Sequence, residues 1–343
     1  MVYDLIKPFV LRADDSIGIV SPSDQVEKAK FPMRISRAVN ALKSIGLKTV
    51  FSKHVYGDKN LMLTIEDRAK DLNEMFDNPE IKCIMSTWGG FNSNQLLEYL
   101  DFENIKRNPK IIIGYSDISL LLNAIYSKVG LITFHGPSFL VDFGEFPTTL
   151  PYTVDNFKKA VMSTIPIGTI VQPHEFTDEY LGWDVDDYKK GRKLIKAPNW
   201  EYIKKGFGEG NLIGGNVDTF NFLVGTEYFP NIDNSIFFFE DSFYNNPSEI
   251  KRLFRGLVHL KQVRVFDSLN GMIIGRINGC DRITYKYLVK GILDLTRDFD
   301  FPILSNVDIG HTEPKLTLPI GVNSKLDSEN SNSFEITEAA VVK

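Results

Sequence analysis

Ser116 lies in the stretch IIIGYSDISLLLNAIYSKVG, where β-branched residues typical of a buried strand meet a long apolar helical pattern. A serine in such a strand-to-helix turn projects its hydroxyl above the edge of the sheet, as a nucleophile must. The backbone N–H of Asp117 lies at the positive end of the predicted helix, where it can stabilise an oxyanion. Ile118 replaces the second glycine of the usual G-x-S-x-G motif, so the alternative that Ser116 only caps the helix stays open.

A serine nucleophile needs a general base, and each of the five histidines of the chain is a candidate. His311, in NVDIGHTEP, follows a strand-like segment and lies in a loop bounded by Gly and Pro. Open α/β sheets place their chemistry in such loops, so His311 is the preferred base. His135, in TFHGP, ends a predicted strand and is the second candidate. The other three lie in segments without a predicted role: His54, His174 and His259.

The base needs an acid that orients it, and the best-placed carboxylate closes the apolar strand SIFFFEDS. Because Glu240 follows a run of apolar residues, its carboxylate is partly desolvated and requires a cationic or hydrogen-bonding partner. Asp241 and Asp308 are rival acids, and a salt bridge or a helix cap is the plainer role for Glu240. With Glu240 the chain order is Ser…Glu…His, which occurs among serine hydrolases on α/β folds.

Two adjacent glycines, Gly89 and Gly90, follow a predicted buried strand and precede a predicted helix in MSTWGGFNSN. Glycines allow backbone N–H groups to approach a ligand closely. This turn can therefore supply a second oxyanion donor, and a plain strand-to-helix turn is the alternative.

The 343-residue chain has the composition of an ordinary globular protein, with 43% hydrophobic and 24% charged residues. Its net charge of −5 argues against nucleic acid as a partner, since nucleic-acid binding usually requires a basic face. Cys83 and Cys280 lie far apart and form no CxxC pair, so neither a disulfide framework nor a metal site is predicted. We expect no signal peptide, no membrane span and a cytoplasmic location.

Strand-like and helix-like segments alternate through residues 1–165, which predicts parallel βαβ units in a layered α/β domain. Residues 166–210 are charged, aromatic and interrupted by Gly and Pro, and form either a linker or a long functional loop. Residues 211–343 mix strand-like segments with two helical patterns, which predicts a second, smaller α/β domain.

The motifs GYSD, LLLNAIYSKVGLITFHGP, LIGGN, FFFED and DIGHTEP, in this order, resemble the LD-carboxypeptidase family of serine peptidases over nearly the whole chain. The resemblance implies a flavodoxin-like N-terminal domain and a swivelling-type C-terminal domain with the site between them. It implies Ser116 as nucleophile, His311 as base and Glu240 as orienting acid. It also implies oxyanion donors from the N–H groups of Asp117 and Gly90. Members of the family are commonly homodimers, and the reaction requires no metal or cofactor.

The family has two branches, and the turn Trp88-Gly89-Gly90 favours one of them. Murein-recycling members tend to carry arginine where this chain has Trp88, while GGFNSNQLL and the aromatic loop after EFTDEY resemble the microcin-immunity, MccF-like branch. That branch cleaves an amide between a C-terminal acidic residue and a nucleotide-like group. The resemblance implies a small peptide or peptidyl-nucleotide as substrate and Trp183 as the residue that stacks on the nucleobase. Gly89 and Asn216 complete the implied substrate-binding set.

Three other functions stay open at this point. A murein tetrapeptide carboxypeptidase that releases D-alanine belongs to the other branch of the family. A nucleotide-binding protein without catalysis would match the glycines of GFGEGNLIGG, although such a glycine pattern alone is weak. An ester hydrolase with the same three residues is the last alternative, and the missing elbow glycine argues against an ordinary α/β-hydrolase.

Overall fold

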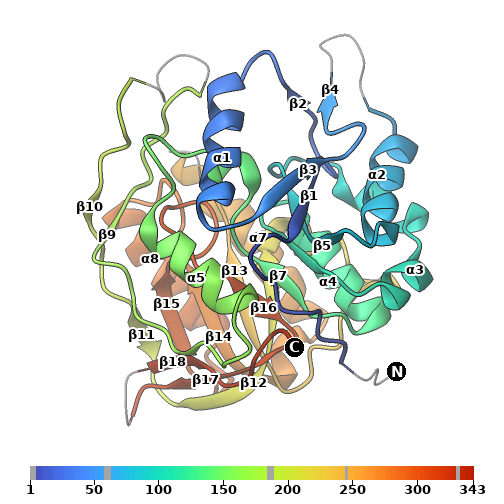
Figure 1. The fold of residues 1–343 in the computed structure, drawn as a ribbon. Helices are drawn as coiled ribbons and strands as arrows, with labels where there is room; N and C mark the ends of the chain where they lie inside the picture. The colour runs from blue at the N-terminus through green and yellow to red at the C-terminus, as the bar shows by residue number, and fades with distance from the viewer. Residues whose placement is uncertain (1–4, 58–62, 184–188, 244–245, 330–332) are drawn as a thin grey trace.

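The first part of the chain, in which strands and helices alternate, contributes five strands to a six-stranded sheet (Figure 1). The computed structural model describes residues 5–57, 63–183, 189–243, 246–329 and 333–343. The strands of this sheet are β1 (Ser16–Val20), β3 (Lys48–Phe51), β5 (Ile81–Ser86), β6 (Ile111–Gly114), β7 (Thr133–His135) and β16 (Leu318–Ile320). Five of them run parallel in the order β3-β1-β5-β6-β7, which is the 2-1-3-4-5 order of flavodoxin-like folds. The predicted layered parallel sheet is confirmed.

Local sequence sets the ends of the helices in this part. The helices are α1 (Pro32–Ser44), α2 (Ile65–Asp77), η1 (Ser93–Tyr99, 3-10), α3 (Phe102–Arg107), α4 (Ile118–Val129), η2 (Phe139–Phe143, π) and α5 (Pro151–Val161). The Oγ1 of Thr64 accepts the N–H of Asp67 at 3.1 Å and begins α2. The helix predicted after Gly89 and Gly90 is η1, and α3 follows it as a separate helix, because Asp101 accepts the N–H of Asn104 at 2.8 Å and begins a new helix.

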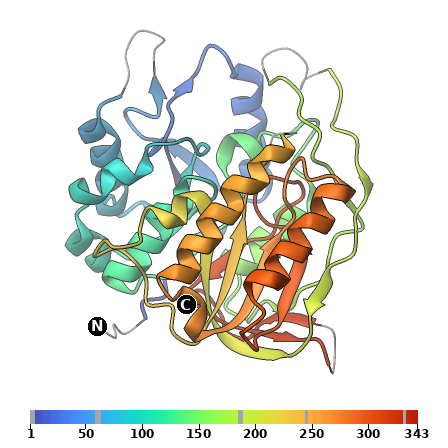
Figure 2. The ribbon, with the colours of Figure 1, turned by 180° about the vertical axis from the view of Figure 1, so that it is seen from behind.

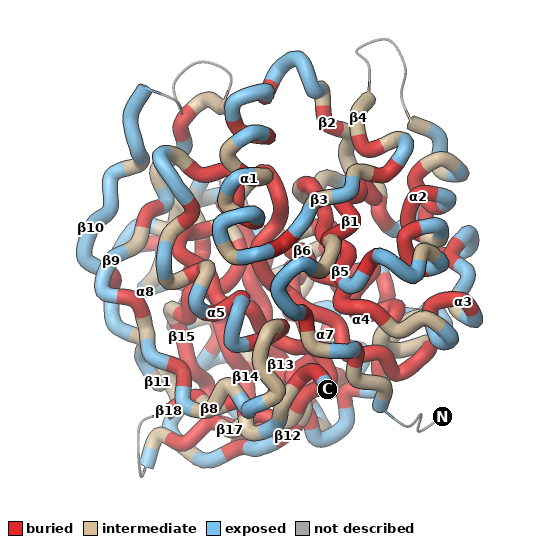
Figure 3. Tube along the Cα trace, viewed as in Figure 1, coloured by how far each residue is buried: buried red, intermediate tan, exposed pale blue. Residues whose placement is uncertain are grey.

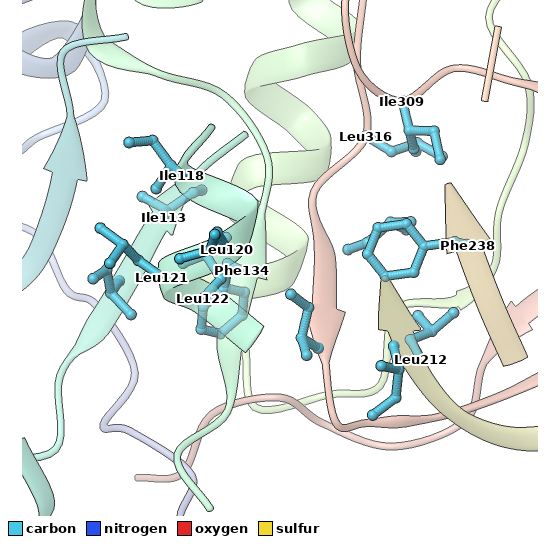
Figure 4. Packing of buried hydrophobic residues seen from close by; sticks show 14 of the residues in the cluster. Ile113, Ile118, Leu120, Leu121, Leu122, Phe134, Leu212, Phe238, Ile309 and Leu316 are labelled. Atoms are coloured by element: carbon cyan, nitrogen blue, oxygen red, sulfur yellow. The ribbon is translucent and has the colours of Figure 1, made fainter. Parts of the chain in front are cut away.

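Helix α4, which follows the candidate nucleophile, is apolar on nearly all sides and lies in the interior, as such a helix must. The side-chain amide of Asn123 donates to the carbonyl oxygen of Gly214 in the second sheet at 2.8 Å. A Cβ atom at Gly215 would lie 2.5 Å from the Cβ of Ser119, so the close approach of helix and strand requires glycine there. Figure 4 shows two groups of buried side chains at this interface: Ile113, Ile118, Leu120, Leu121, Leu122 and Phe134 on one side, and Leu212, Phe238, Ile309 and Leu316 on the other.

The second sheet has eight strands around a parallel centre. They are β8 (Gly168–Thr169), β11 (Glu201–Lys204), β12 (Phe207–Asn216), β13 (Ser235–Glu240), β14 (Leu269–Gly275), β15 (Ile303–Val307), β17 (Asn323–Asp327) and β18 (Ser333–Ile336). Strands β12 to β15 are parallel to one another, and the flanking strands are antiparallel. The helices of this part are α6 (Val217–Asn221), η3 (Pro247–Glu249), α7 (Ile250–Gln262), η4 (Val265–Ser268) and α8 (Arg282–Leu295). Figure 2 shows α7 and α8 side by side over one face of the sheet.

The chain crosses between the two sheets at three short strands. Strand β16 comes from the C-terminal part and pairs antiparallel with β7 of the first sheet. Strands β8 and β11 come from the connecting segment and join the second sheet at its two edges. Two minor ladders pair β2 (Val26–Glu27) with β4 (Tyr56–Gly57) and β9 (Glu175–Phe176) with β10 (Ile195–Lys196). The two sheets are therefore joined by these strands as well as by the packing of their side chains.

The most deeply buried segments are the central strands, drawn in red in Figure 3, and they carry the site at their carboxyl ends. Four of the five glycines of GFGEGNLIGG lie inside the ten-residue strand β12, and Gly206 directly precedes this strand. A dinucleotide fingerprint requires its glycines in the turn after a strand, so this pattern does not form one. Within the described ranges, no helix is long and apolar enough to cross a membrane.

Candidate active site

Ser116 has a strained backbone conformation between β6 and α4. Its φ of 62° lies in the left-handed region, which residues other than glycine rarely adopt. Such strain persists only where the surrounding structure fixes it, and it concentrates at functional sites. The N–H of Ser119 donates to the carbonyl oxygen of Ser116 at 2.9 Å and fixes the turn at the start of α4. The structure therefore has the sharp strand-to-helix turn that the sequence predicted.

The hydroxyl of Ser116 begins a chain of two hydrogen bonds that joins the two sheets. The Nε2 of His311 lies 3.0 Å from Ser116 Oγ. The Nδ1 of the same ring lies 2.6 Å from Glu240 Oε2. Ser116 follows β6, Glu240 ends β13, and His311 lies in the loop after β15. Three residues that are remote in sequence thus meet at the carboxyl ends of parallel strands, where α/β folds bind their ligands.

The protonation states in this chain follow from the burial of Glu240, which has no exposed surface. Burial is the largest influence on the pKa of Glu240 and by itself raises it, while the charge and the hydrogen bond of the adjoining His311 ring lower it. With further contributions from His135 and Asn216, the pKa of Glu240 lies below its ordinary value. Glu240 is therefore ionised at neutral pH and can only accept hydrogen bonds. Nδ1 of His311 must carry the proton between them, so the lone pair of Nε2 points to the hydroxyl of Ser116.

The two rival acids have other partners. Asp308 is fully buried and accepts hydrogen bonds from Arg276 at 3.0 Å and from Trp200 Nε1 at 2.7 Å. Asp241 accepts from Arg252 at 2.8 Å. Each of these carboxylates is neutralised by a guanidinium, which leaves Glu240 as the carboxylate that contacts the histidine.

His135, the second candidate for the base, lies behind the site. It is buried, and burial lowers the pKa of His135 to about 4, so its ring is neutral. Its Nδ1 lies 3.3 Å from the hydroxyl of Ser119, and its ring packs edge-on against Tyr115 and Phe238. These contacts indicate that His135 has a structural role at the interface of the two sheets.

The glycine turn packs directly on the serine. A Cβ atom at Gly89 would lie 2.8 Å from the Cβ and 2.9 Å from the Oγ of Ser116. Gly90 has a φ of 147°, which favours glycine, and its Cα faces Ser23. Within the described part of the chain, neither the N–H of Gly90 nor that of Asp117 donates a hydrogen bond to another protein group. Both amides are therefore available to a substrate oxygen.

We expect Gly89→Ala to lower kcat about 100-fold, because the added methyl group must displace the Ser116 side chain from its hydrogen bond, and a misplacement of about 1 Å can cost that much. Steady-state kinetics and a thermal melt of the purified variant measure this. Gly191→Ala is the matched control, since the nearest atom to its new methyl group lies at 3.4 Å, an ordinary contact. Equal kcat values for the two variants would contradict this account of the turn.

The side chain of Asp117 connects three loops of the first sheet. Its Oδ2 accepts from the hydroxyl of Ser23 at 2.5 Å and from the N–H of Ser93 at 2.8 Å. The hydroxyl of Ser93 in turn donates to the carbonyl oxygen of Asp117 at 2.8 Å. The loops after β1 and β5 are thereby fixed against the turn that carries Ser116.

A cavity of about 300 Å³ opens over Ser116 and His311, and aromatic side chains form one of its walls. Trp183 stacks on Trp88, with ring centroids 5.8 Å apart and planes at 27°. The guanidinium of Arg34 lies over the Trp183 ring at 4.1 Å from its centroid. Trp200 lines a neighbouring cavity instead. Trp88 and Trp183 are therefore the tryptophans of this cavity among the described residues.

Charged side chains from distant segments also line this cavity, and sequence reasoning missed them. Arg192 donates to Glu145 at 2.5 Å, and Arg34 lies 3.6 Å from the same carboxylate. Glu313 lies 4.0 Å from Arg192, and burial together with the nearby Asp142 raises the pKa of Glu313 to about 8. The available signal was the pair of charges in HTEPK, directly after His311.

Asn216, which the resemblance implied as a substrate-binding residue, lies beside Glu240 on the neighbouring strand. Its Oδ1 accepts the N–H of Thr219 at 3.2 Å and caps α6. Among the described residues, those that line the cavity do not include Asn216. Gly89, Gly90 and Trp183 do line it.

Two sequence models of one family match this chain: the LD-carboxypeptidase N-terminal domain over residues 17–136 and the LD-carboxypeptidase C-terminal domain over residues 209–326. The chain is 39% identical to the microcin C7 self-immunity protein MccF of Escherichia coli over 340 residues, covering 96% of this chain and 94% of that protein. It is 35% identical to the putative carboxypeptidase YocD of Bacillus subtilis (strain 168), covering 94% and 96%. The probable murein peptide carboxypeptidase of that organism is 26% identical, covering 98% and 95%.

Solved structures give the same result. An MccF-like protein from Bacillus anthracis str. Ames matches with a TM-score of 0.88 and 34% identity, covering 96% of this chain and 99% of that chain. MccF in complex with aspartyl sulfamoyl adenosine matches with a TM-score of 0.88 and 36% identity, covering 98% and 100%. From its sequence, its two sheets and these similarities, the chain belongs to the LD-carboxypeptidase family of serine peptidases, as its motifs predicted.

Proposed function

We propose that this chain is an MccF-like amidase that hydrolyses the bond between a C-terminal acidic residue and a nucleotide-like group. Such a reaction inactivates microcin-type toxins and other aminoacyl-adenylate analogues, and would confer resistance to them. One observation carries the proposal: the stacked Trp88 and Trp183 lie in the same cavity as Ser116 and His311. The similarity to MccF, whose complex with aspartyl sulfamoyl adenosine has the same fold, supports it.

In the proposed acylation, Ser116 Oγ attacks the carbonyl carbon of the amide while His311 Nε2 takes the hydroxyl proton. Glu240 holds Nδ1 and stabilises the imidazolium that forms. The N–H groups of Asp117 and Gly90 stabilise the charge that develops on the carbonyl oxygen. His311 then gives its proton to the leaving nitrogen, the C–N bond breaks, and the acyl group remains on Ser116 as an ester.

Deacylation reverses these roles with water as the nucleophile. His311 Nε2 removes a proton from water as the water oxygen attacks the ester carbon, and the proton then returns to Ser116 Oγ. The products are an acid with a new carboxylate and the amine of the nucleotide-like group. One water is consumed for each amide cleaved.

The alternative within the family is a murein tetrapeptide carboxypeptidase that releases D-alanine. The 26% identity to a probable murein peptide carboxypeptidase is the observation in its favour. Against it, Trp88 stands where that branch tends to carry arginine, and its indole N–H donates to the carbonyl oxygen of Asp24 at 2.8 Å. A nucleotide-binding protein without catalysis is disfavoured because Ser116, His311 and Glu240 form a continuous hydrogen-bonded chain.

A two-substrate assay tests the proposal. The purified protein is incubated with glutamyl or aspartyl sulfamoyl-adenosine and, separately, with murein tetrapeptide, and the products are identified by mass spectrometry. We expect cleavage of the adenosine analogues and little or no release of D-alanine. Release of D-alanine without cleavage of the analogues would contradict the proposal and would show that the chain acts on murein peptides.

We expect Trp183→Ala to lower kcat/KM for the adenosine analogues roughly five- to a hundred-fold, because stacking of a base on an aromatic ring contributes about 1–3 kcal/mol. Hydrolysis of a small amide without a base should be largely unaffected. Trp200→Phe is the control, since Trp200 lies in the neighbouring cavity. If Trp183→Ala matches the wild-type protein on both substrates, the role of Trp183 in binding the base is wrong.

We also propose that the protein is a cytoplasmic homodimer, as members of this family commonly are. The two cysteines are free, as is usual in reducing compartments. Light scattering of the purified chain at several concentrations measures its mass in solution, and a monomer at all concentrations would contradict the dimer.

A further inference from the structure

A buried lysine lies on the same loop as the candidate base. Lys315 is 1% exposed, and its Nζ lies 2.7 Å from Asp142 Oδ1 and 2.9 Å from Glu313 Oε1. The Oδ2 of Asp142 accepts hydrogen bonds from the N–H of Ser138 at 2.7 Å and from its hydroxyl at 3.1 Å. Asp142 lies in η2, beside the first sheet, whereas Lys315 and Glu313 follow His311. The ion pair thus ties the loop of the base to the domain of the nucleophile.

Tyr115 lies between this ion pair and the reacting residues. The ammonium of Lys315 lies 3.6 Å from the centroid of the Tyr115 ring. The same ring packs edge-on against the His311 imidazole, with centroids 5.2 Å apart and planes at 69°. Tyr115 is also the residue directly before Ser116. Tyr115 therefore contacts both Lys315 and His311, and it is also the chain neighbour of the nucleophile.

The ammonium of Lys315 is paired within a group of charged side chains. A buried ammonium is costly unless it is paired, and here two carboxylates contact it. Arg192 and Arg34 both contact Glu145, and Arg192 also lies 4.0 Å from Glu313. Counting Asp142 and Glu313 as well, three cations face three carboxyl groups, of which Glu313 has its pKa raised to about 8 by burial and by Asp142. Lys315 acts on His311 through Tyr115 and the loop that Lys315 and His311 share, so the contribution of Lys315 is geometric.

We propose that Lys315 is a positioning residue, which holds the base loop and Tyr115 so that His311 Nε2 stays within hydrogen-bond reach of Ser116 Oγ. The inference rests on the proposed roles of Ser116 and His311. Its physical reason is that a proton transfer requires a heavy-atom distance of about 2.6–3.2 Å, and the observed 3.0 Å leaves little room for displacement.

Backbone contacts keep the loop folded when the charges are removed. The N–H of Thr177 donates to the carbonyl oxygen of Glu313 at 2.7 Å, and the N–H of Glu313 donates to the carbonyl oxygen of Thr177 at 2.9 Å. The N–H of Lys315 donates to the hydroxyl of Thr153 at 3.1 Å. The charged side chains therefore adjust the final position of the loop. Substitutions of these side chains should lower the reaction rate more than they lower the stability of the fold.

The test compares three variants with the wild-type protein. Asp142→Asn/Lys315→Met removes a cation and an anion together, so that no uncompensated buried charge remains. Glu313→Gln removes one of the two carboxylates that contact the lysine and keeps the side-chain volume. Lys128→Met is the matched control, since Lys128 also contacts a carboxylate (Glu227, 2.6 Å) and an aromatic ring, far from the site.

The first readout is covalent labelling of Ser116 by a fluorophosphonate, followed by intact mass spectrometry, because it needs no knowledge of the substrate. We expect the double variant to be labelled about 10- to 100-fold more slowly, with kcat for the adenosine analogue reduced by the same factor and KM changed by less than about two-fold. A smaller reduction is expected for Glu313→Gln, and none for Lys128→Met. Circular dichroism confirms that each variant is folded.

The possible outcomes distinguish the role of Lys315 from the proposed function of the whole site. A folded double variant that is labelled at the wild-type rate overturns the role of Lys315. If the double variant does not fold, Glu313→Gln decides by the same readouts, and a wild-type labelling rate then overturns the role. A wild-type protein that is labelled at Ser116 but leaves the adenosine analogue intact overturns the substrate assignment alone. A wild-type protein that is not labelled overturns both.

Discussion

The Ser116→Ala variant is expected to fold as the wild-type protein does and to lose amide hydrolysis. The hydroxyl of Ser116 donates a hydrogen bond to His311 Nε2 at 3.0 Å, and the variant has no oxygen atom to form the acyl ester. Loss of the serine in such a group of residues costs roughly 10⁶-fold in kcat. Steady-state hydrolysis of glutamyl sulfamoyl-adenosine, with a thermal melt for the fold, measures the loss.

Ser127→Ala is the matched control for this experiment. Ser127 lies on α4 like the residues after Ser116, but its hydroxyl donates to the carbonyl oxygen of Phe229 at 3.0 Å, away from the cavity. The control should keep its activity. Near wild-type turnover in Ser116→Ala would show that another group is the nucleophile.

His311→Ala and Glu240→Gln form the second prediction, and their effects should not add to that of Ser116→Ala. The three side chains act as one hydrogen-bonded unit, so removing any second member from the serine variant should change little. We expect Glu240→Gln to be milder than His311→Ala, because the carboxylate orients and stabilises the ring without reacting itself. Turnover of the single and double variants on the adenosine analogue tests this.

Two controls distinguish the chosen residues from their rivals. Asp308→Asn should be less damaging than Glu240→Gln, because Asp308 pairs with Arg276. His135→Ala should retain the pathway through His311, although the loss of a buried ring will lower stability. A larger loss in Asp308→Asn, or activity that depends on His135 and not on His311, would mean that the acid or the base is misassigned.

The candidate site was accessible from the sequence because its residues lie at the ends of apolar strands. The strand before Ser116 is buried and followed by a long apolar helical pattern, and Glu240 closes a strand of three phenylalanines. A carboxylate or hydroxyl at such a place is conspicuous, because burial of polar groups requires a partner. The alternation of strand and helix likewise predicted the parallel first sheet.

The charge network around Lys315 was not accessible in this way. Its members come from segments that are far apart, with Asp142 beside the first sheet and Lys315 after the base. A buried lysine and a surface lysine look alike in sequence, because only the folded chain brings the compensating carboxylates to it. The position of Trp200, whose indole N–H donates to Asp308, likewise depends on the folded chain.

The exchange of strands between the sheets was missed for a different reason. Strands β8 and β16 have two and three residues, too few to show the alternation that predicts a strand. Their pairing depends on which sheet edge is exposed nearby. The glycine-rich strand β12 resembled a phosphate-binding turn in sequence, but its glycines lie in a strand, and Gly215 allows close packing on α4.

The most direct test of the central claim is peptide mapping of the acyl-enzyme. The wild-type protein is mixed with glutamyl sulfamoyl-adenosine, quenched in acid within a turnover, digested and analysed by mass spectrometry. We predict a glutamyl ester on the peptide that contains Ser116, and its absence from the Ser116→Ala variant. Turnover of the analogue with the glutamyl group on another residue, or an intact analogue after prolonged incubation, would contradict the account.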